Sequence, residues 1–309
     1  MLYLTTRERA NSYTAYRVLR TFQAPDGGMF MPMQLPVFDD VTLDRFERMN
    51  FGETVAEILN LFFGTQLSGW NVDFATGRQA VDLHQMGHKL SIIESWHNPA
   101  GSHEYFIQRL FRLVTGRSNN LSEYNLWFET VVDIALLFVA YGKLCRRDLY
   151  EFDVALWTGD LQMLLAVRYA QKMGLPIRKI ILGCADGDGM WDLLSYGDYT
   201  VSVKERNVCF EALLWLEFGY DEVAQYLRTL QRKSIYRLSQ EKLASFRNQL
   251  FGAVVGEGRA KNVAENIALT MDYRMSTDTS KAFAALQDYR AKTGVNKDTL
   301  LLSRNMPDN

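Results

Sequence analysis

Apolar residues recur at helical spacing along most of the chain and predict a protein rich in helices. In this pattern one apolar side chain appears every three to four positions, as on one face of an amphipathic helix. The segments that show it are residues 12–23, 42–63, 124–144, 161–173, 208–230, 240–251, 261–271 and 280–293. The first two are separated by Ala24-Pro25-Asp26-Gly27-Gly28, a turn sequence because proline presets φ and glycine accepts positive φ. We therefore expect a helical N-terminal module over residues 1–68.

Short apolar runs without helical spacing predict strands at residues 90–93 and 180–182. Gly174 and Pro176 precede the second run and have the chemistry of a helix end, so a helix, a turn and a strand follow one another directly. This succession is typical of α/β proteins. Residues 69–309 are therefore predicted to form an α/β core.

Composition and charge exclude several classes of partner. The 309 residues are 48% hydrophobic, enough for a large core, and their net charge of -2 without a Lys/Arg run argues against nucleic acid and anionic membranes as partners. The longest apolar stretch, residues 131–140, contains Asp133 and is too short to span a bilayer, and the first residues lack the apolar segment of a signal peptide. Three cysteines without CxxC spacing predict reduced thiols. We expect a soluble cytoplasmic protein.

Three groups of motifs, in order along the chain, resemble threonine synthase. They are Thr5-Thr6-Arg7 with Ala24-Pro25-Asp26-Gly27-Gly28-Met29-Phe30-Met31-Pro32, Thr158-Gly159-Asp160 with residues 169–177 and 197–199, and residues 278–294 with 300–307. Threonine synthase is a fold-type-II pyridoxal-phosphate enzyme that converts O-phosphohomoserine to threonine. The resemblance implies a helix-rich α/β fold like that family's large domain.

The cofactor-binding lysine of that family is missing. Its motif Glu-x-Phe-His-Gly-Pro-Thr-x-Ala-Phe-Lys-Asp aligns without gaps with residues 94–105, and Glu104 stands where the lysine belongs. A carboxylate cannot form an imine, and its charge repels a phosphorylated cofactor. The resemblance therefore implies a protein without pyridoxal phosphate and without any other cofactor.

Two further losses agree with the first. In the family's phosphate-binding loop, which begins here at Thr158-Gly159-Asp160, Gln162 replaces a glycine and Asp160 adds negative charge. The family's small cofactor-binding domain is absent between Thr115 and Ser122, so we place a deletion near residues 116–121. The chain is thus expected to be a truncated, degenerate large domain.

Some chemistry remains conceivable at these positions. His97 and Glu104 form a candidate acid/base pair, whereas His103, also a candidate catalytic residue, must point away from Glu104 if both lie on a helix. The opposing interpretation is that Glu104 only forms a salt bridge or contacts water. Thr158-Gly159-Asp160 is a candidate ligand or phosphate site because a helix N-terminus offers N–H groups. Asp160 is equally suited to cap the helix that starts at Leu161.

A metal site is the weaker alternative. All four histidines lie within twenty residues, and His84 and His88 would share one face if that segment were helical. With Glu94 or Glu104 they would suit Zn²⁺ or Fe²⁺. Gly87 weakens such a helix and no HExxH motif is present, so no metal is predicted and His84 with His88 stays the alternative.

Loss of a domain exposes the apolar face on which it packed, and soluble proteins seldom leave large patches uncovered. We therefore expect a non-catalytic pseudoenzyme that forms a homodimer or binds a partner protein. The alternative is a repurposed lyase or hydrolase of specialised biosynthesis, independent of pyridoxal phosphate, acting on an amino-acid-like or phosphorylated substrate through His97 and Glu104. A small amino-acid-like ligand fits either hypothesis.

Overall fold

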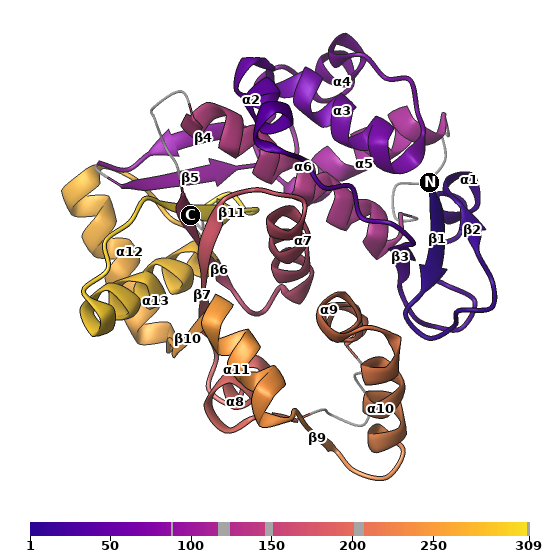
Figure 1. The fold of residues 1–309 in the computed structure, drawn as a ribbon. Coiled ribbons are helices and arrows are strands. Elements are labelled where there is room, and N and C mark those ends of the chain that lie inside the picture. The colour runs from indigo at the N-terminus through magenta and orange to yellow at the C-terminus, as the bar shows by residue number, and fades with distance from the viewer. Residues whose placement is uncertain (88, 117–123, 146–150, 201–206, 308–309) are drawn as a thin grey trace.

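The computed structural model describes residues 1–87, 89–116, 124–145, 151–200 and 207–307, and a six-stranded sheet lies at its centre (Figure 1). In chain order the strands are β4 (Asp82–Gln85), β5 (Leu90–Glu94), β6 (Phe152–Trp157), β7 (Ile177–Cys184), β10 (Leu250–Val254) and β11 (Thr299–Ser303). They are arranged in the order β10-β7-β6-β11-β5-β4, and every pair is parallel except β4 with β5. The fold is α/β and helix-rich, as predicted.

Helices cover both faces of this sheet. The pair α12 (Glu257–Met271) and α13 (Thr277–Thr293) packs on one face, and α6 (Leu126–Cys145) with α7 (Leu161–Lys172) lies on the other (Figure 1). Alternate residues of each strand therefore enter different apolar clusters, as Val154 and Ala155 do. Strands buried on both faces read as continuous apolar runs, which explains why β6 was not predicted.

The predicted helical N-terminal module contains a small sheet, so that prediction is wrong in part. The antiparallel strands β2 (Tyr13–Thr14), β1 (Leu2–Thr5) and β3 (Phe30–Pro32) precede the longer helices. The helix expected over residues 12–23 is only α1 (Ala15–Val18). Strands of two to four residues are too short to show a period of two, so the pattern did not distinguish them. The remaining helices of this region are α2 (Asp40–Arg48), α3 (Phe51–Phe63) and α4 (Gly69–Thr76).

Several predicted helices are shorter than the pattern suggested. Residues 42–63 break where Asn50 caps α3 in a capping box with Glu53. Residues 208–230 break at Gly219, which adopts a φ of 83° between two helices, and residues 240–251 end early because Leu250 begins β10. The elements not yet named are α5 (His103–Thr115), α8 (Gly189–Tyr196), β8 (Asp198–Thr200), α9 (Val208–Phe218), α10 (Tyr220–Leu230), β9 (Ile235–Arg237) and α11 (Gln240–Gln249).

The proposed deletion near residues 116–121 lies almost wholly outside the described residues. Helix α5 ends at Gly116, whose φ of 65° is the left-handed conformation of a helix C-cap, and residues 117–123 follow. The division at residue 68 and the deletion both remain predictions.

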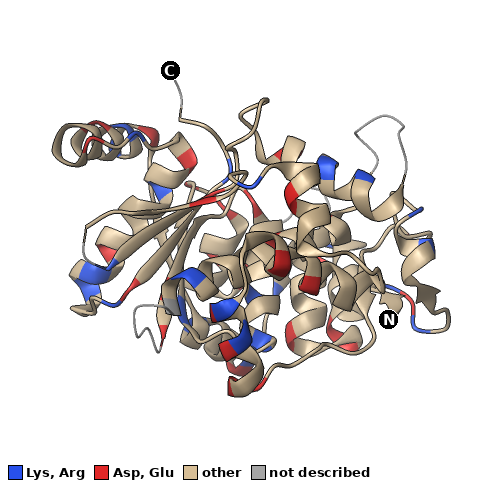
Figure 2. Cartoon of the chain, turned by 90° about the horizontal axis from the view of Figure 1, so that it is seen from above, with Lys and Arg blue, Asp and Glu red and all other residues tan. Residues whose placement is uncertain are grey.

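Three expectations from the composition can be compared with the structure: membrane-spanning segments, the distribution of charge and the state of the cysteines. Within the described residues, the structure contains no helix with the length and apolarity needed to cross a membrane. Acidic and basic residues are interspersed along the ribbon in Figure 2. Cys184 and Cys209 are free, buried thiols, and burial raises the pKa of each to about 12. These two cysteines match the prediction of reduced thiols; the side chain of Cys145 lies outside the description.

Candidate functional site

The carboxyl ends of the parallel strands meet at one edge of the sheet, where open α/β sheets form their ligand sites. Strand β5 ends at Glu94, β6 ends just before Thr158-Gly159-Asp160, and β11 is followed by Arg304. Helix α5 starts at the same edge, because Ser102 forms a bridge with Asn305 just beyond β11. The predicted site residues that follow β5 and β6 therefore belong to one region of the molecule.

Two predicted site residues, His103 and Glu104, lie in the first turn of α5. Ser102 caps the helix by accepting a hydrogen bond from the Tyr105 N–H at 3.1 Å. His103 points inward and is buried, whereas Glu104 is exposed and accepts a hydrogen bond from Gln108 at 3.0 Å. The prediction that these neighbours point in different directions is confirmed.

His97 pairs with a different carboxylate from the one predicted. Its Nε2 lies 2.6 Å from Glu94 Oε2, and its ring stacks on Trp96 with 4.2 Å between centroids. The predicted pair of His97 with Glu104 is not formed among the described side chains. The chain turns sharply between the two residues, where Asn98 donates to the Ser102 carbonyl at 2.8 Å. That turn leaves the nearer Glu94 as the partner of His97.

A tyrosine extends the His97–Glu94 pair. Tyr273 donates its hydroxyl proton to Glu94 Oε1, and burial together with this hydrogen bond raises the pKa of Tyr273. Because the carboxylate holds Nε2 of His97, the Nδ1 nitrogen is left to accept or deliver a proton. The His97 side chain is one-third exposed.

Polar side chains of the loop after β6 form hydrogen bonds to other groups of the protein. The Thr158 hydroxyl lies 2.5 Å from Asp188 Oδ2 and 3.1 Å from the Gly183 carbonyl, and a Cβ at Gly159 would approach Trp157 Nε1 to 2.3 Å. Asp160 Oδ1 accepts the Met163 N–H at 3.1 Å, which confirms the predicted role as helix cap. A ligand or phosphate at this loop stays a prediction.

Arg304 connects the carboxylates of this edge. Its guanidinium donates to Asp133, to Asp160 and, at 3.2 Å, to Glu129 Oε1, and it also contacts Gln162 Oε1 at 3.1 Å. Three carboxylates therefore share one cation. Burial raises the pKa of Glu129 to about 7 because it disfavours the charged form of the carboxyl group.

His103 lies against the same cluster. Its Nε2 is 3.2 Å from Asp133 Oδ1. Burial, and then the positive charge of Arg304, lower the pKa of His103, so its ring is neutral at neutral pH. The sequence singled out His103 but not Glu129, Asp133 or Arg304. Carboxylates four residues apart on an otherwise apolar helix were the available indication.

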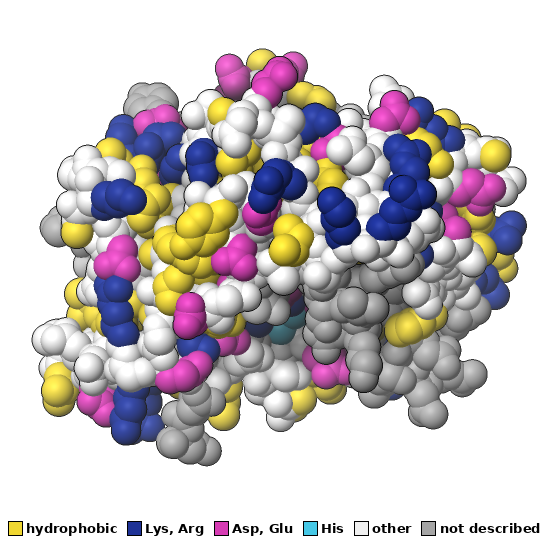
Figure 3. Space-filling view, turned by 90° about the horizontal axis from the view of Figure 1, so that it is seen from below, with side chains coloured by type: hydrophobic (Ala, Val, Ile, Leu, Met, Phe, Trp, Pro, Cys, Tyr) yellow, Lys and Arg dark blue, Asp and Glu magenta, His cyan; other side chains and the backbone are white. Residues whose placement is uncertain are grey.

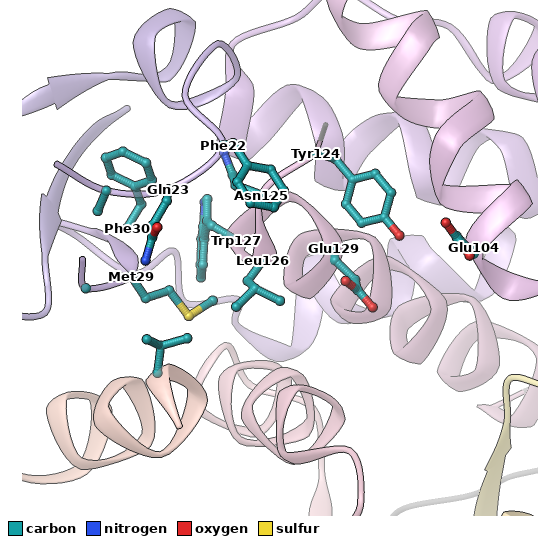
Figure 4. Close-up of a pocket in the computed structure, with 13 residues that line it drawn as sticks. Phe22, Gln23, Met29, Phe30, Glu104, Tyr124, Asn125, Leu126, Trp127 and Glu129 are labelled. Atoms are coloured by element: carbon teal, nitrogen blue, oxygen red, sulfur yellow. The ribbon is translucent and has the colours of Figure 1, made fainter. Parts of the chain in front are cut away.

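A cavity of about 370 Å³ opens beside these residues (Figure 4). Apolar side chains line most of it, among them Phe22, Met29, Phe30, Leu126 and Trp127. At its other end the Tyr124 hydroxyl and the carboxylates of Glu104 and Glu129 point toward one another. From below, the molecule is hollowed near its centre, and a histidine is visible on the floor of the hollow (Figure 3). The sequence did not predict the cavity because its walls come from distant segments.

The alternative metal site at His84 and His88 assumed a helix, but His84 lies on a strand. His84 lies on β4, opposite Ile92 of β5, and stacks on Tyr273 with 4.7 Å between centroids. The segment forms the edge strand of the six-stranded sheet, so the expected helical face does not exist. His88 lies outside the described residues.

Comparison with known proteins agrees with the motifs. Residues 2–72 match the family model "Threonine synthase N terminus". The chain is 32% identical over 106 residues to "Threonine synthase-like 2" of Homo sapiens and to that of Pongo abelii. Each match covers 31% of this chain and 22% of the relative, so the sequence similarity spans less than a quarter of the relative's length.

Solved threonine synthases share the fold. The pyridoxal-phosphate-bound enzyme from Brucella melitensis matches with a TM-score of 0.82 at 14% identity, covering 99% of this chain and 89% of that one. The yeast enzyme matches with a TM-score of 0.82 at 16% identity, covering 99% and 87%. The resemblance to threonine synthase is confirmed in the N-terminal segment and in the fold.

Proposed function

We propose that this threonine synthase-like chain has no pyridoxal-phosphate chemistry and acts as a non-catalytic protein that associates with a second copy of itself or with a partner protein. The observation that carries the proposal is Glu104, an exposed carboxylate in the first turn of α5 where the family motif has its lysine. A carboxylate cannot form the imine on which that chemistry depends.

The surrounding residues do not fit the cofactor either. A phosphate at the N-terminus of α7 would meet the Asp160 carboxylate, which already caps that helix. Lys89 precedes β5 and donates to the Asn296 carbonyl at 3.0 Å, so it lies at the opposite edge of the sheet. Lys281 is ion-paired with Glu257 at 2.6 Å. A visible imine band on addition of pyridoxal phosphate would contradict this part of the proposal.

An exposed apolar groove supports the association. Met1, Leu2, Met33 and Val37 line it, and all four side chains are exposed. Exposed apolar side chains gathered around one hollow are typical of protein-binding surfaces, whereas isolated ones are not. The groove lies beside β1 and β3, in the segment that matches the family model.

Size-exclusion chromatography with light scattering tests the association. We expect the wild-type mass to rise with concentration toward a dimer, and Val37→Asp to weaken association at least tenfold because it brings an unpaired charge into an apolar contact. The control is Leu269→Asp, whose side chain is also exposed, 87% against 71% for Val37, but lies on α12. A monomer at every concentration that also captures no partner protein contradicts the proposal.

A second candidate function is supported by the Tyr273–Glu94–His97 chain. This arrangement suits a general base in a lyase or hydrolase that does not use pyridoxal phosphate. With such an activity in hand, His97→Ala and Glu94→Gln should each lower kcat by about 10²–10⁴-fold. Glu104→Gln separates the pairings: if it abolishes turnover while Glu94→Gln does not, Glu104 is the partner of His97.

A cytoplasmic location belongs to the same proposal. It is supported by Cys184 and Cys209, which are free and buried, since an oxidising compartment favours paired cysteines.

A further inference from the structure

Three side chains direct metal-ligand atoms toward one point between α5 and α6. His103 is the first residue of α5, and Glu129 and Asp133 lie four residues apart on one face of α6. One ligand atom from each side chain lies within 4.8 Å of those from the other two.

Two of the three side chains are buried and carry polar atoms that form no hydrogen bond within the described residues. His103 is 4% exposed and Asp133 is 1% exposed. Within the described part of the chain, neither ring nitrogen of His103 nor Oδ1 of Asp133 has a hydrogen-bond partner. Buried polar atoms are almost always bonded, and leaving one unsatisfied costs about 1–3 kcal/mol. The orphaned atoms therefore point to a ligand.

The spacing of these atoms suits a shared ion. His103 Nε2 and Asp133 Oδ1 are 3.2 Å apart without the angles of a hydrogen bond. Two ligands at about 2.1 Å from one Zn²⁺ ion, separated by 90–110°, lie about 3.0–3.4 Å from each other. A small cation can thus bind both atoms with little movement.

Arg304 supports the site without filling it. Its guanidinium contacts Glu129 Oε1 and Asp133 Oδ2, so among the described residues the second oxygen of each carboxylate forms no hydrogen bond and is left for an ion. Hydrogen bonds to the outer atoms of ligands commonly hold metal sites in place. With Asp160, three carboxyl groups face one guanidinium, so the cluster offers more acidic groups than Arg304 can pair.

We propose that a divalent transition-metal ion of the Zn²⁺ class binds His103, Glu129 and Asp133. One imidazole with two carboxylates suits such an ion. Glu129 also lines the cavity of Figure 4, so a remaining coordination position can be reached from there. The site is independent of the proposed association and differs from the candidate at His84 and His88.

A second cluster, Asp82, Glu94 and His97, has similar spacing but carries no such inference. Its buried carboxylate, Glu94, is already bonded to His97 and Tyr273. That cluster provides the control for the experiment.

The test uses the full-length chain after treatment with a chelator. Zn²⁺ alone is titrated by calorimetry, and the bound metal is measured by elemental analysis. We expect one ion per chain, at least a hundredfold weaker binding for His103→Asn and for Asp133→Asn, and unchanged binding for His97→Ala. Co²⁺ in place of Zn²⁺ should give visible absorption bands that disappear in the first two variants.

Circular dichroism of the metal-free variants confirms that they are folded. Should both buried variants unfold, Glu129→Gln takes their place, since Glu129 is less buried than the other two ligands. Absence of bound Zn²⁺ in the wild type overturns the proposal. So does binding that survives His103→Asn, or binding that is lost in His97→Ala, which would assign the ion to the second cluster.

Discussion

Replacing Arg304 with methionine is expected to lower the free energy of unfolding by about 3–5 kcal/mol at pH 7. The substitution keeps much of the side-chain volume but leaves Glu129, Asp133 and Asp160 buried or half-buried without their shared cation. Uncompensated charges in such a site cost far more than the ion pairs themselves contribute. Urea unfolding followed by circular dichroism measures the loss.

The matched control for Arg304→Met is Arg259→Met. Arg259 donates from two nitrogens to the two oxygens of Asp288, but this pair is exposed, so we expect a loss below about 1 kcal/mol. Asp133→Asn added to Arg304→Met should recover part of the lost stability because it removes one unpaired charge. Equal losses for Arg304→Met and Arg259→Met would mean that water screens the Arg304 cluster.

Residues that cap or end helices allowed parts of the fold to be predicted correctly. Gly174 and Pro176 marked the end of α7, and the strand expected next is β7. Asp160 was recognised as a helix cap from its residue type and position. In contrast, β6 and β10 carry apolar side chains toward both faces of the sheet, as Val154 and Ala155 show, and this pattern resembles a buried helix.

The site was predictable only where helix geometry fixed it. His103 and Glu104 point apart because neighbouring helical residues must do so. The partner of His97 depended on the turn at Asn98, which no spacing rule describes. Arg304 comes more than 140 residues after Asp160, and only the sheet order brings β11 beside β6. The cluster around Arg304 therefore required the structure.

The N-terminal motif has a physical explanation that the resemblance alone did not provide. Thr6 Oγ1 accepts the Met29 N–H at 3.1 Å, and Arg7 donates to the Asp26 carbonyl at 3.0 Å. A Cβ at Gly28 would approach Thr6 Oγ1 to 2.5 Å, so a side chain there would push the two segments apart. The two halves of the motif hold each other, and the Asp26-Gly27-Gly28 turn is structural.

Arg7 also reaches a distant helix, and Arg7→Ala is expected to lower the free energy of unfolding by about 3 kcal/mol. Its guanidinium donates to both oxygens of Glu211 on α9, at 2.8 and 2.6 Å. Glu211 is 0% exposed, so the substitution leaves a buried carboxylate without a counter-ion. The loss is measured by urea unfolding, as for Arg304.

A double-mutant cycle separates this charge effect from lost packing. Glu211→Gln combined with Arg7→Ala should be more stable than Arg7→Ala alone by about 1 kcal/mol or more, because the buried charge is gone. The exposed and more distant pair of Arg45 with Glu57, at 3.7 Å, is the control, and Arg45→Ala should cause no measurable change. If the double variant is no more stable than Arg7→Ala, packing of the arginine stem, and not its charge, joins the N-terminal motif to α9.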